Sequence, residues 1–528
     1  MSTQVTYTSS ELSPEQDRRF EEGLAALRPA EHGHLIGGER RGGAATLEER
    51  NPAAHDERLG RFADGDERDV DDAVRAARAA QRRWSATPAG ERIATFARAA
   101  ELIARDGGLL AAAATLEVGK NRLESMGEVD EVVALIEYYS AQAAAGFDLP
   151  LAGGPGDLHR SVMRPFGVFG VIAPFNFPIA LVAGPAVAAM LAGNAVVAKP
   201  SPTTSLVALM LGDLLAEAGL PPGVFNVVTG GDGAGRALVA HPGLDGLVFT
   251  GSLVVGQAVA RAFGTGAGHV RPCIVEMGGK NPAIVTAGAD LEAAASGIAR
   301  SAFGLSGQKC SACSRVLVEA GAHDDIVAAL VTRAAEWTVA DPRTPAARLG
   351  PVHTGAGYER FERTAAAARR DGAVAYGGRT LRDGDMAGGW FVEPTVVTGL
   401  PAGHAILREE LFLPLVAVER VASLEEAIDR ANDQVYGLTA GLYAESDDEV
   451  AEFLDRIEAG TLFVNRAAGA TSGGWPGQQT YPGWKGSGST NRGALGPRYV
   501  QQFLREQGHV IVGGGTAGRR SSGEPGTI

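Results

Sequence analysis

The chain has 528 residues, of which 45% are hydrophobic and 21% charged, a length and balance that favour roughly two to four domains around large cores. A net charge of −14 argues against nucleic acid or an anionic membrane as the main partner, because both attract basic surfaces. Three cysteines are too few for a disulfide framework and indicate a reducing, cytoplasmic location. The N-terminus lacks the basic and apolar regions of a signal peptide.

The first third of the chain is predicted to be mainly helical. Residues 1–34 are expected to form a polar N-terminal arm with a short helix. The spacing of apolar residues predicts helices over 14–27, 69–84, 91–105 and 128–144. An alternating segment, 158–164, ends at Pro165, which favours an edge strand.

From residue 167 onward, short apolar runs alternate with helical stretches. The runs, predicted as strands, are 167–173, 195–198, 224–228, 246–249 and 273–276; the helices between them are 181–191, 205–218, 233–240 and 255–263. Strands that are apolar throughout and alternate with helices predict a parallel sheet covered on both faces. A similar alternation over 281–464 predicts a second α/β domain. Residues 498–505 are predicted as a last strand, and 509–528 as a disordered tail.

One uncharged stretch, 179–198, is as long as a membrane span. It contains Gly184 and Pro185, and Gly193 and Asn194 interrupt it before a second apolar run. A buried helix followed by a buried strand explains this pattern better than a membrane helix. We therefore expect no membrane partner.

Residues 307–315 (GQKCSACSR) hold two of the three cysteines between two cations. Nearby positive charge lowers the pKa of a thiol and favours the nucleophilic thiolate. Three interpretations compete: a nucleophile, a Cys310–Cys313 redox pair, and a zinc site that adds His269 and Cys273. The redox motif is typical of the first turn of a small domain, and Cys273 lies in a predicted buried strand rather than a zinc knuckle. Both of these alternatives are weaker, and we expect no metal.

A cysteine nucleophile needs an oxyanion donor and a base elsewhere in the chain. Asn176 is a lone amide between two phenylalanines, just after a predicted buried strand. Glu276 is a carboxylate at the end of another. Each has a plain structural alternative: Asn176 as the cap of the next helix, and Glu276 as an ion-pair partner of Lys280.

Six motifs, in this order, resemble the aldehyde dehydrogenase superfamily from about residue 35 to residue 507. They are 174–178 (PFNFP), 199–201 (KPS), 249–252 (FTGS) with Gly256, 276–280 (EMGGK), 307–310 (GQKC) and 409–412 (EELF). The resemblance implies that Cys310 attacks the aldehyde carbon, and that Asn176 and the backbone N–H of Cys310 form the oxyanion hole. It also implies that hydride passes to a nicotinamide and that Glu276 activates the water that hydrolyses the resulting thioester.

The resemblance also implies a set of cofactor-binding residues. They are Pro174, Phe175, Lys199, Ser201, Gly251, Ser252, Gly256, Glu410 and Phe412. Many relatives that prefer NAD have a glutamate three residues after the lysine, where this chain has Pro202. No carboxylate would then repel a 2′-phosphate, so we expect NAD and leave NADP open.

Within the superfamily, residues 307–315 are similar to the 1-pyrroline-5-carboxylate dehydrogenases, which oxidise L-glutamate γ-semialdehyde to glutamate. The resemblance implies that the following residues contact the substrate: Glu131, Phe177, Ser311, Gly473, Gly474 and Tyr481. Ser311 and the loop with Gly473 and Gly474 would hold the α-carboxylate, although a plain flexible connection is the alternative for that loop. The chain departs from the branch at 480–483 (TYPG), and Leu413 replaces a common glycine. Another semialdehyde, an aromatic aldehyde, or a catalytically silent structural member remain alternatives.

The resemblance implies an aldehyde dehydrogenase-like α/β fold of two doubly wound domains and a small β hairpin for oligomerisation. The NAD(P)-binding domain is expected over 35–147 and 167–276, and the catalytic domain over 277–484. The bridging part is expected over 148–166 and 485–508. An exposed strand edge of this kind can pair with a neighbouring subunit, so we expect a homodimer or a higher homo-oligomer.

Overall fold

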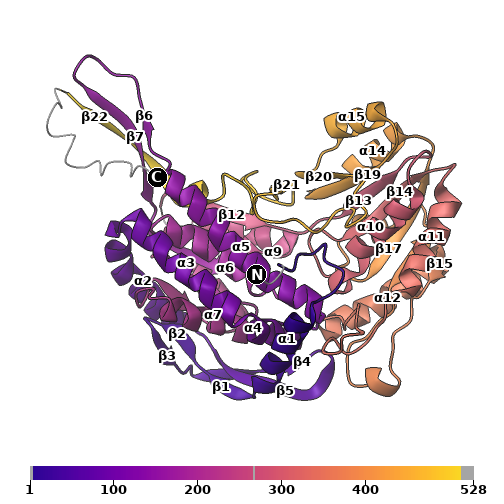
Figure 1. Ribbon diagram of the computed structural model, residues 1–528, viewed down its shortest axis with the longest axis horizontal. Helices are drawn as coiled ribbons and strands as arrows, with labels where there is room; N and C mark the ends of the chain where they lie inside the picture. Colours follow the sequence, from indigo (N-terminus) through magenta and orange to yellow (C-terminus); the bar gives the residue numbers. More distant parts are fainter. Residues whose placement is uncertain (1–3, 266–267, 513–528) are drawn as a thin grey trace.

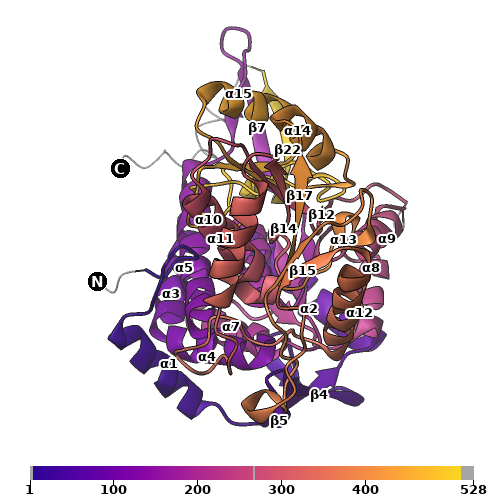
Figure 2. The ribbon, with the colours of Figure 1, turned by 90° about the vertical axis from the view of Figure 1, so that its right-hand side faces the viewer.

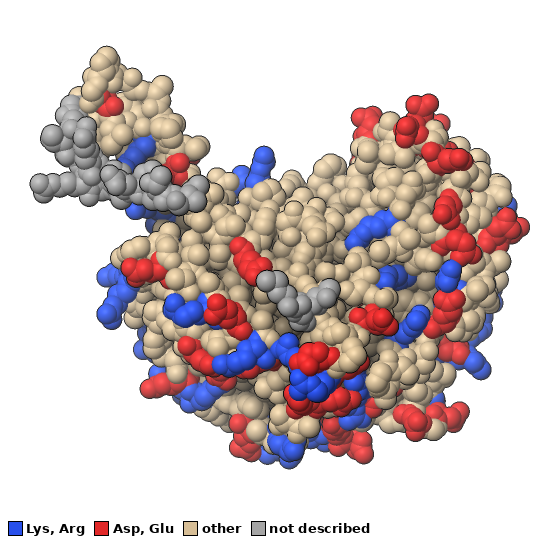
Figure 3. Space-filling view, viewed as in Figure 1, with Lys and Arg blue, Asp and Glu red and all other residues tan. Residues whose placement is uncertain are grey.

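The computed structural model describes residues 4–265 and 268–512 and shows two lobes with a projecting hairpin (Figure 1). The first lobe carries most of the N-terminal half of the chain, and the second carries strands β13–β20. Figure 2 shows the hairpin standing out from the body of the molecule. Acidic side chains gather over helices α14 (Leu424–Asn432) and α15 (Asp447–Arg456), in keeping with the negative net charge (Figure 3).

The first lobe is built on a seven-stranded sheet in the order β12-β11-β8-β9-β10-β2-β3. Its five parallel strands are β8 (Val168–Ile172), β9 (Ala195–Lys199), β10 (Phe225–Val227), β11 (Gly246–Thr250) and β12 (Cys273–Glu276). The helices that follow them are α6 (Ala180–Leu191), α7 (Leu206–Glu217), α8 (Asp232–Ala240) and α9 (Leu253–Thr265). Each strand and helix predicted between residues 167 and 276 is thereby confirmed, with ends that shift by one or two residues.

The first 145 residues add helices and a second small sheet to this lobe. The helices are α1 (Pro14–Ala26), α2 (Glu67–Ala86), α3 (Ala89–Arg105), α4 (Gly107–Val118) and α5 (Arg122–Ala145). Strands β1 (Ala30–His32), β4 (Ala45–Asn51) and β5 (Ala54–Asp64) form the small sheet, whereas β2 (His34–Ile36) and β3 (Glu39–Arg41) extend the seven-stranded sheet. Helix α5 begins earlier than predicted because the Asn121 side chain accepts a hydrogen bond from Glu124 N and caps it.

Helix α4 was not predicted, and the boundary of the N-terminal arm was wrong. All of α4 except Leu109 is buried, so it has no polar face and no helical periodicity. The arm is not separate from the domain, because β1 pairs with β5 and β2 pairs with β10. The predicted boundary after residue 34 therefore falls inside strand β2.

The second lobe contains another seven-stranded sheet, in the order β15-β16-β17-β14-β13-β19-β20. The strands are β13 (Asn281–Val285), β14 (Cys313–Glu319), β15 (Ala373–Tyr376), β16 (Thr395–Thr398), β17 (Leu415–Val421), β19 (Thr439–Tyr443) and β20 (Thr461–Val464). Besides α14 and α15, its helices are α10 (Leu291–Phe303), α11 (His323–Ala335), α12 (Gly355–Asp371) and α13 (Ala405–Arg408). The predicted second α/β domain is confirmed.

The projecting hairpin is a three-stranded sheet in the order β22-β7-β6. Strand β7 (Leu158–Pro165) pairs antiparallel with β22 (Leu504–Ile511) and with β6 (Leu149–Pro150). The prediction of a strand over 498–505 was wrong, because 500–503 form a 3-10 turn and the strand begins at Leu504. Strand β22 also crosses the predicted start of a disordered tail at 509. Residues 513–528 of that tail lie outside the described residues.

Two further features correct or confirm the sequence analysis. The predicted boundary between residues 484 and 485 falls inside strand β21 (Trp484–Lys485), which pairs with β18 (Tyr436–Gly437). The apolar stretch 179–198 forms helix α6 and strand β9, as predicted. Over the described residues, every helix is too short or too polar to cross a membrane.

Candidate active site

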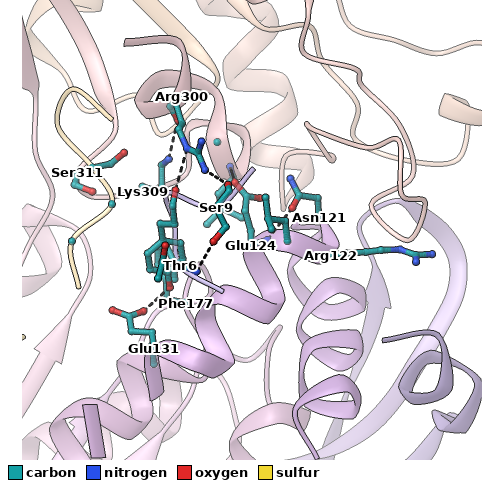
Figure 4. Close-up of a pocket in the computed structure, with 18 of the residues that line it drawn as sticks. Thr6, Ser9, Asn121, Arg122, Glu124, Glu131, Phe177, Arg300, Lys309 and Ser311 are labelled. Carbon is teal, nitrogen blue, oxygen red and sulfur yellow. Dashed lines mark hydrogen bonds between the residues drawn. The ribbon is translucent and has the colours of Figure 1, made fainter. Parts of the chain in front are cut away.

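A cavity of about 830 Å³ opens where the two lobes meet, and it brings together residues that are far apart in sequence (Figure 4). Eight of the residues singled out from the sequence line it: Glu131, Phe177, Glu276, Cys310, Ser311, Gly473, Gly474 and Tyr481. Glu131 comes from α5, Glu276 from the end of β12, and Cys310 from the loop before β14. Asn176 is 3% exposed and lies directly behind the loop that carries Cys310.

The loop before Cys310 has an unusual backbone. Leu305 and Ser306 have φ angles of 51° and 52°, and Gly307 has a φ of 67°. At Gly307 a Cβ atom would overlap the carbonyl of Leu413, so the position requires glycine. Left-handed non-glycine residues cost free energy and persist where the surroundings fix them, often at functional sites. The Asn281 side chain closes the loop by donating to the carbonyl of Cys310 at 2.7 Å.

The cations beside Cys310 do not activate it, contrary to what the sequence suggested. Lys309 Nζ donates to the carbonyl of Arg300 at 3.4 Å, and Arg315 pairs with Glu419 at 2.8 Å. Burial, followed by the charges of Glu410 and Glu276, raises the pKa of the Cys310 thiol to about 12. The thiol is therefore neutral at rest and requires a base before it attacks.

Asn176 does not cap the helix that follows it. Its Nδ2 donates to the carbonyl of Gln308 at 3.0 Å. Glu128 caps that helix instead, because its Oε1 accepts from the backbone N–H groups of Ile179 and Ala180 at 2.8 and 2.9 Å. A carboxamide has two N–H donors, so one bond to Gln308 leaves a second donor beside the Cys310 loop.

Glu276 lines the cavity between the lobes, at the end of β12. Burial raises the pKa of its carboxyl to about 7, although the backbone N–H of Ala494 donates to it. The alternative ion pair with Lys280 is absent from the described residues, where Lys280 Nζ has no hydrogen-bond partner. Burial lowers the pKa of Lys280 to about 7. A carboxyl that titrates near neutrality is suited to general base catalysis.

The remaining cysteine interpretations find no support in the described residues. All three cysteines are free thiols. Cys313 is buried, and its thiol donates to the carbonyl of Arg315 at 3.4 Å. Nowhere in residues 4–265 and 268–512 do three or more His, Cys, Asp or Glu side chains form a group able to hold a metal ion.

The loop with Gly473 and Gly474 is held in place rather than flexible. Thr471 Oγ1 donates to the carbonyl of Ser311 at 2.7 Å, which ties the loop to the nucleophile segment. Arg466 donates to the carbonyls of Ser472 and Gly473, both at 2.7 Å. With its carbonyls engaged, the loop keeps a fixed backbone beside Ser311.

Tyr481 covers part of this loop. A Cβ atom on Gly474 would overlap the Tyr481 ring, and the Gly474 backbone hydrogen-bonds to the Tyr481 phenol. This N–H is one of those that the resemblance assigned to a substrate carboxylate. The departure at 480–483 therefore changes the shape and the donors of the pocket.

The residues assigned to the cofactor lie around the carboxyl ends of β8, β9, β11 and β12. Lys199 Nζ donates to the carbonyls of Pro200 and Gly230 at 2.8 and 2.9 Å, and burial lowers its pKa to about 8. Gly279 N donates to Glu410 Oε1 at 3.1 Å, and burial raises the pKa of Glu410 to about 7. Phe412 has a φ of 57° and lies edge-on to Phe175 at 5.9 Å.

Five more assigned residues lie at or near the ends of these strands. Gly251 and Ser252 form the turn between β11 and α9, and Gly256 lies in the first turns of α9, where a Cβ would overlap Met277. Ser201 Oγ is 3.0 Å from Thr203 Oγ1. Pro174 follows β8.

Three residues of the site were missed from the sequence. Tyr7 reaches the cavity from the N-terminal segment, while Arg466 and Asn281 support its loops. Asn281 carried a weak signal, as an amide at the start of a buried strand. Tyr7 carried none, because its place depends on contacts with residues more than a hundred positions away.

Comparisons with known proteins identify relatives of the whole chain. The model of the Aldehyde dehydrogenase family matches residues 40–508. The chain is 33% identical to a curated 1-pyrroline-5-carboxylate dehydrogenase of Bacillus cereus over 92% of this chain and 94% of the relative.

Two solved structures are similar as well. A Thermus 1-pyrroline-5-carboxylate dehydrogenase with bound NAD has a TM-score of 0.90 and 33% identity, over 95% of this chain and 98% of that one. Proline utilization A from Bdellovibrio bacteriovorus has a TM-score of 0.89 and 33% identity, over 94% of this chain, which spans 51% of that protein. The chain belongs to the aldehyde dehydrogenase family.

Proposed function

We propose that this protein oxidises L-glutamate γ-semialdehyde to L-glutamate with NAD or NADP. One observation carries the proposal: a single cavity combines Cys310, Glu276 and the backbone loop at 471–474 beside Ser311. The similarity to the curated 1-pyrroline-5-carboxylate dehydrogenase of Bacillus cereus supports the choice of substrate. A catalytically silent member is disfavoured, because Cys310, Asn176 and Glu276 are all present.

The first step is attack by sulfur. Glu276 takes the proton of the Cys310 thiol, and the sulfur bonds to the aldehyde carbon while the C=O electrons move onto oxygen. The second N–H of Asn176 and the backbone N–H of Cys310 donate to this oxyanion. Because the resting pKa of Cys310 is about 12, proton removal and attack are coupled rather than separate.

The second half of the reaction releases the acid. A nicotinamide held by residues such as Glu410 and Phe412 would supply the acceptor for the hydride that leaves the tetrahedral carbon. Cys310 then holds a thioester. After Glu276 has released its first proton to solvent, it takes a proton from water, and the hydroxide attacks the thioester carbonyl. The C–S bond breaks, and Cys310 regains a proton.

The cofactor face fits a dinucleotide. Helix α9 begins directly after Ser252, and free N–H groups in its first turn suit a pyrophosphate. Val254 and Val255 at this end are 76% and 48% exposed, which suits the apolar face of an adenine ring. A Cβ on Gly235 would lie 3.3 Å from Lys199 Cε, so glycine leaves room beside the lysine for a ribose. Pro202 offers no carboxylate against a 2′-phosphate.

The position of Tyr481 favours a second candidate for the aldehyde. Because the Tyr481 ring covers Gly474, the loop offers fewer free N–H groups to a carboxylate. A different semialdehyde or an aromatic aldehyde would use the Tyr481 ring as a wall instead.

Following NAD(P)H absorbance with glutamate semialdehyde and a panel of other aldehydes tests the proposal. We expect the highest kcat/KM for glutamate semialdehyde. Rapid turnover of another aldehyde with none of the semialdehyde would refute the substrate. A comparison of kcat/KM with NAD and NADP in the same assay identifies the preferred cofactor.

We also propose a cytoplasmic homo-oligomer. The three free thiols suit a reducing compartment. The hairpin exposes apolar side chains, with Leu149 62%, Leu151 53% and Val510 65% exposed, which suits pairing with a second copy. Light scattering on the purified chain tests this, and a monomer at micromolar concentration would refute it.

A further inference from the structure

The N-terminal segment, residues 4–10, runs along the wall of the catalytic cavity. Thr6, Tyr7 and Ser9 line the same cavity as Cys310. Arg300 donates to the carbonyl of Ser9, and Figure 4 shows Ser9 on the side of the cavity that faces Arg300. The segment thus belongs to the site, although it lies about three hundred positions from the nucleophile in the sequence.

Tyr7 makes the closest contacts of this segment with the site. Its hydroxyl donates to Glu131 Oε2 at 2.5 Å. Its ring lies edge-on to Phe177 at 5.7 Å and to Trp475 at 6.2 Å. A Cβ on Gly473 would lie 3.7 Å from the Tyr7 Cβ. Tyr7 therefore contacts helix α5, the residue after Asn176 and the loop beside Ser311 at once.

The segment is held on both sides of Tyr7. Val5 is 2% exposed, and its N–H donates to Asp130 Oδ2 at 2.6 Å. Arg300 donates to the carbonyl of Tyr7 at 3.1 Å and also to that of Ser9. Gly127 of α5 lies against the Tyr7 ring, since a Cβ there would be in ordinary van der Waals contact with it at 3.7 Å. These bonds and contacts place the ring as part of the wall.

The next helix fastens the segment to the lobe. A Cβ on Gly23 of α1 would overlap the carbonyl of Gly108 in α4, so the two helices approach to backbone contact. The guanidinium of Arg122 lies 4.8 Å from the centre of the Phe20 ring and pairs with Glu21. Close packing of α1 limits how far residues 4–10 move away from the cavity.

We propose that Tyr7 is a specificity-determining residue whose ring closes the far end of the aldehyde pocket and limits the length of the aldehyde that reaches Cys310. This rests on the proposed function only in assuming that aldehydes enter this cavity. Burial raises the pKa of Tyr7 above its ordinary value and that of Glu131 to about 7. The phenol thus stays protonated and keeps its bond to Glu131 at neutral pH.

Kinetics with two aldehydes that differ only in length test the proposal. In Tyr7→Ala, the ratio of kcat/KM for octanal to that for propanal should rise about tenfold, because the ring no longer blocks the longer chain. Tyr7→Phe keeps the ring and should keep the wild-type ratio, as should Thr8→Ala, whose side chain is exposed and does not line the cavity. An unchanged ratio in Tyr7→Ala would overturn the proposal.

Alkylation of Cys310 gives a second readout that requires no turnover. Peptide mass spectrometry separates Cys310 from Cys273, the other partly exposed thiol. Tyr7→Ala should speed labelling of Cys310 by the bulky N-phenylmaleimide about tenfold and leave labelling by iodoacetamide unchanged. Equal acceleration of both reagents would indicate general loosening and would overturn the proposal.

The two readouts separate this proposal from the proposed function. If the wild type oxidises propanal but not glutamate semialdehyde, the proposed substrate is wrong, but the ratio of kcat/KM for octanal to that for propanal still tests the role of Tyr7. If no aldehyde reacts, the alkylation rates alone test the role of Tyr7. Should Tyr7→Ala fail to fold, Tyr7→Trp replaces it. The larger ring should lower the ratio of kcat/KM for octanal to that for propanal and slow the labelling of Cys310 by N-phenylmaleimide. Wild-type values of both quantities in Tyr7→Trp would overturn the proposal.

Discussion

The two lobes supply different kinds of residue to one cavity. Asn176 and Glu276 come from the first lobe, close after or at the ends of parallel strands β8 and β12. Cys310 and the loop 471–474 come from irregular segments of the second lobe, held by Asn281 and Arg466. In this site, regular structure positions the oxyanion donor and the base, while irregular loops carry the nucleophile and the substrate contacts.

Replacing the nucleophile should have the largest effect. Cys310→Ala should lower kcat by at least about 10⁴-fold, since no other group forms the covalent bond to the substrate. Cys313→Ala is the matched control. Its buried thiol only donates to Arg315, so we expect near wild-type kcat with a small loss in Tm. Equal losses in both variants would show that the loop, rather than the thiol of Cys310, limits the rate.

Replacing Asn176, the oxyanion donor from the first lobe, should have the second-largest effect. Asn176→Ala should lower kcat about 10²–10³-fold, while the affinity for the cofactor, measured by NADH fluorescence, stays near that of the wild type. The lost bond to Gln308 also predicts a looser Cys310 loop. Asn176→Asp should lower kcat further, because a carboxylate can donate neither to the Gln308 carbonyl nor to the oxyanion and places a negative charge beside the oxyanion. If Asn176→Ala retained the wild-type kcat, the assignment would be wrong.

The role of Glu276 as the base should appear in the pH dependence of the deacylation rate. The pKa of Glu276 is raised to about 7 by burial, so the carboxyl is protonated and inactive below this pH and ionised above it. Deacylation should therefore fall about tenfold for each pH unit below 7 and level off above it. Turnover of p-nitrophenyl acetate without cofactor isolates this step from the titration of Glu410. In Glu276→Gln, both the burst of nitrophenol and the steady turnover should be lost at every pH, because Glu276 also takes the proton of the Cys310 thiol in the first step.

The difference between the lobes also explains what could be predicted from the sequence. The second α/β domain was predicted over 281–464, and its sheet begins at Asn281 and ends at Val464, because buried parallel strands leave apolar runs between helices. Helix α4 was missed for the opposite reason, since a helix buried on all sides shows no periodicity.

Pairing between strands that are far apart in the sequence was the main obstacle to predicting the domain boundaries. Three predicted domain boundaries fall inside strands β2, β21 and β22, whose partners lie far away in the sequence. The direction of side chains was a second obstacle, because it cannot be read from the sequence. Lys309 and Arg315 flank Cys310 in sequence, yet one faces Arg300 and the other pairs with Glu419. Tyr7 combines both obstacles, since its bond to Glu131 spans 124 positions.

Removing the contact between Ser311 and the substrate carboxylate should have the smallest effect. It tests most directly whether the second lobe supplies the substrate contacts. Ser311 is 8% exposed and lines the cavity, and Thr471 donates to its carbonyl at 2.7 Å, which fixes the backbone at this position. Loss of a hydrogen bond to a charged group costs about 1.5–3 kcal/mol, so Ser311→Ala should raise KM for glutamate semialdehyde at least about tenfold. KM for propanal, which has no carboxylate, should not change.

Ser314→Ala is the matched control for this prediction, because the Ser314 hydroxyl has no hydrogen-bond partner among the described residues. We expect wild-type KM for both aldehydes in that variant. A rise in KM for propanal as well as for the semialdehyde in Ser311→Ala would mean that the serine shapes the nucleophile loop. In that case the α-carboxylate would have to be held by the loop 471–474 alone, with Tyr481 covering one of its glycines.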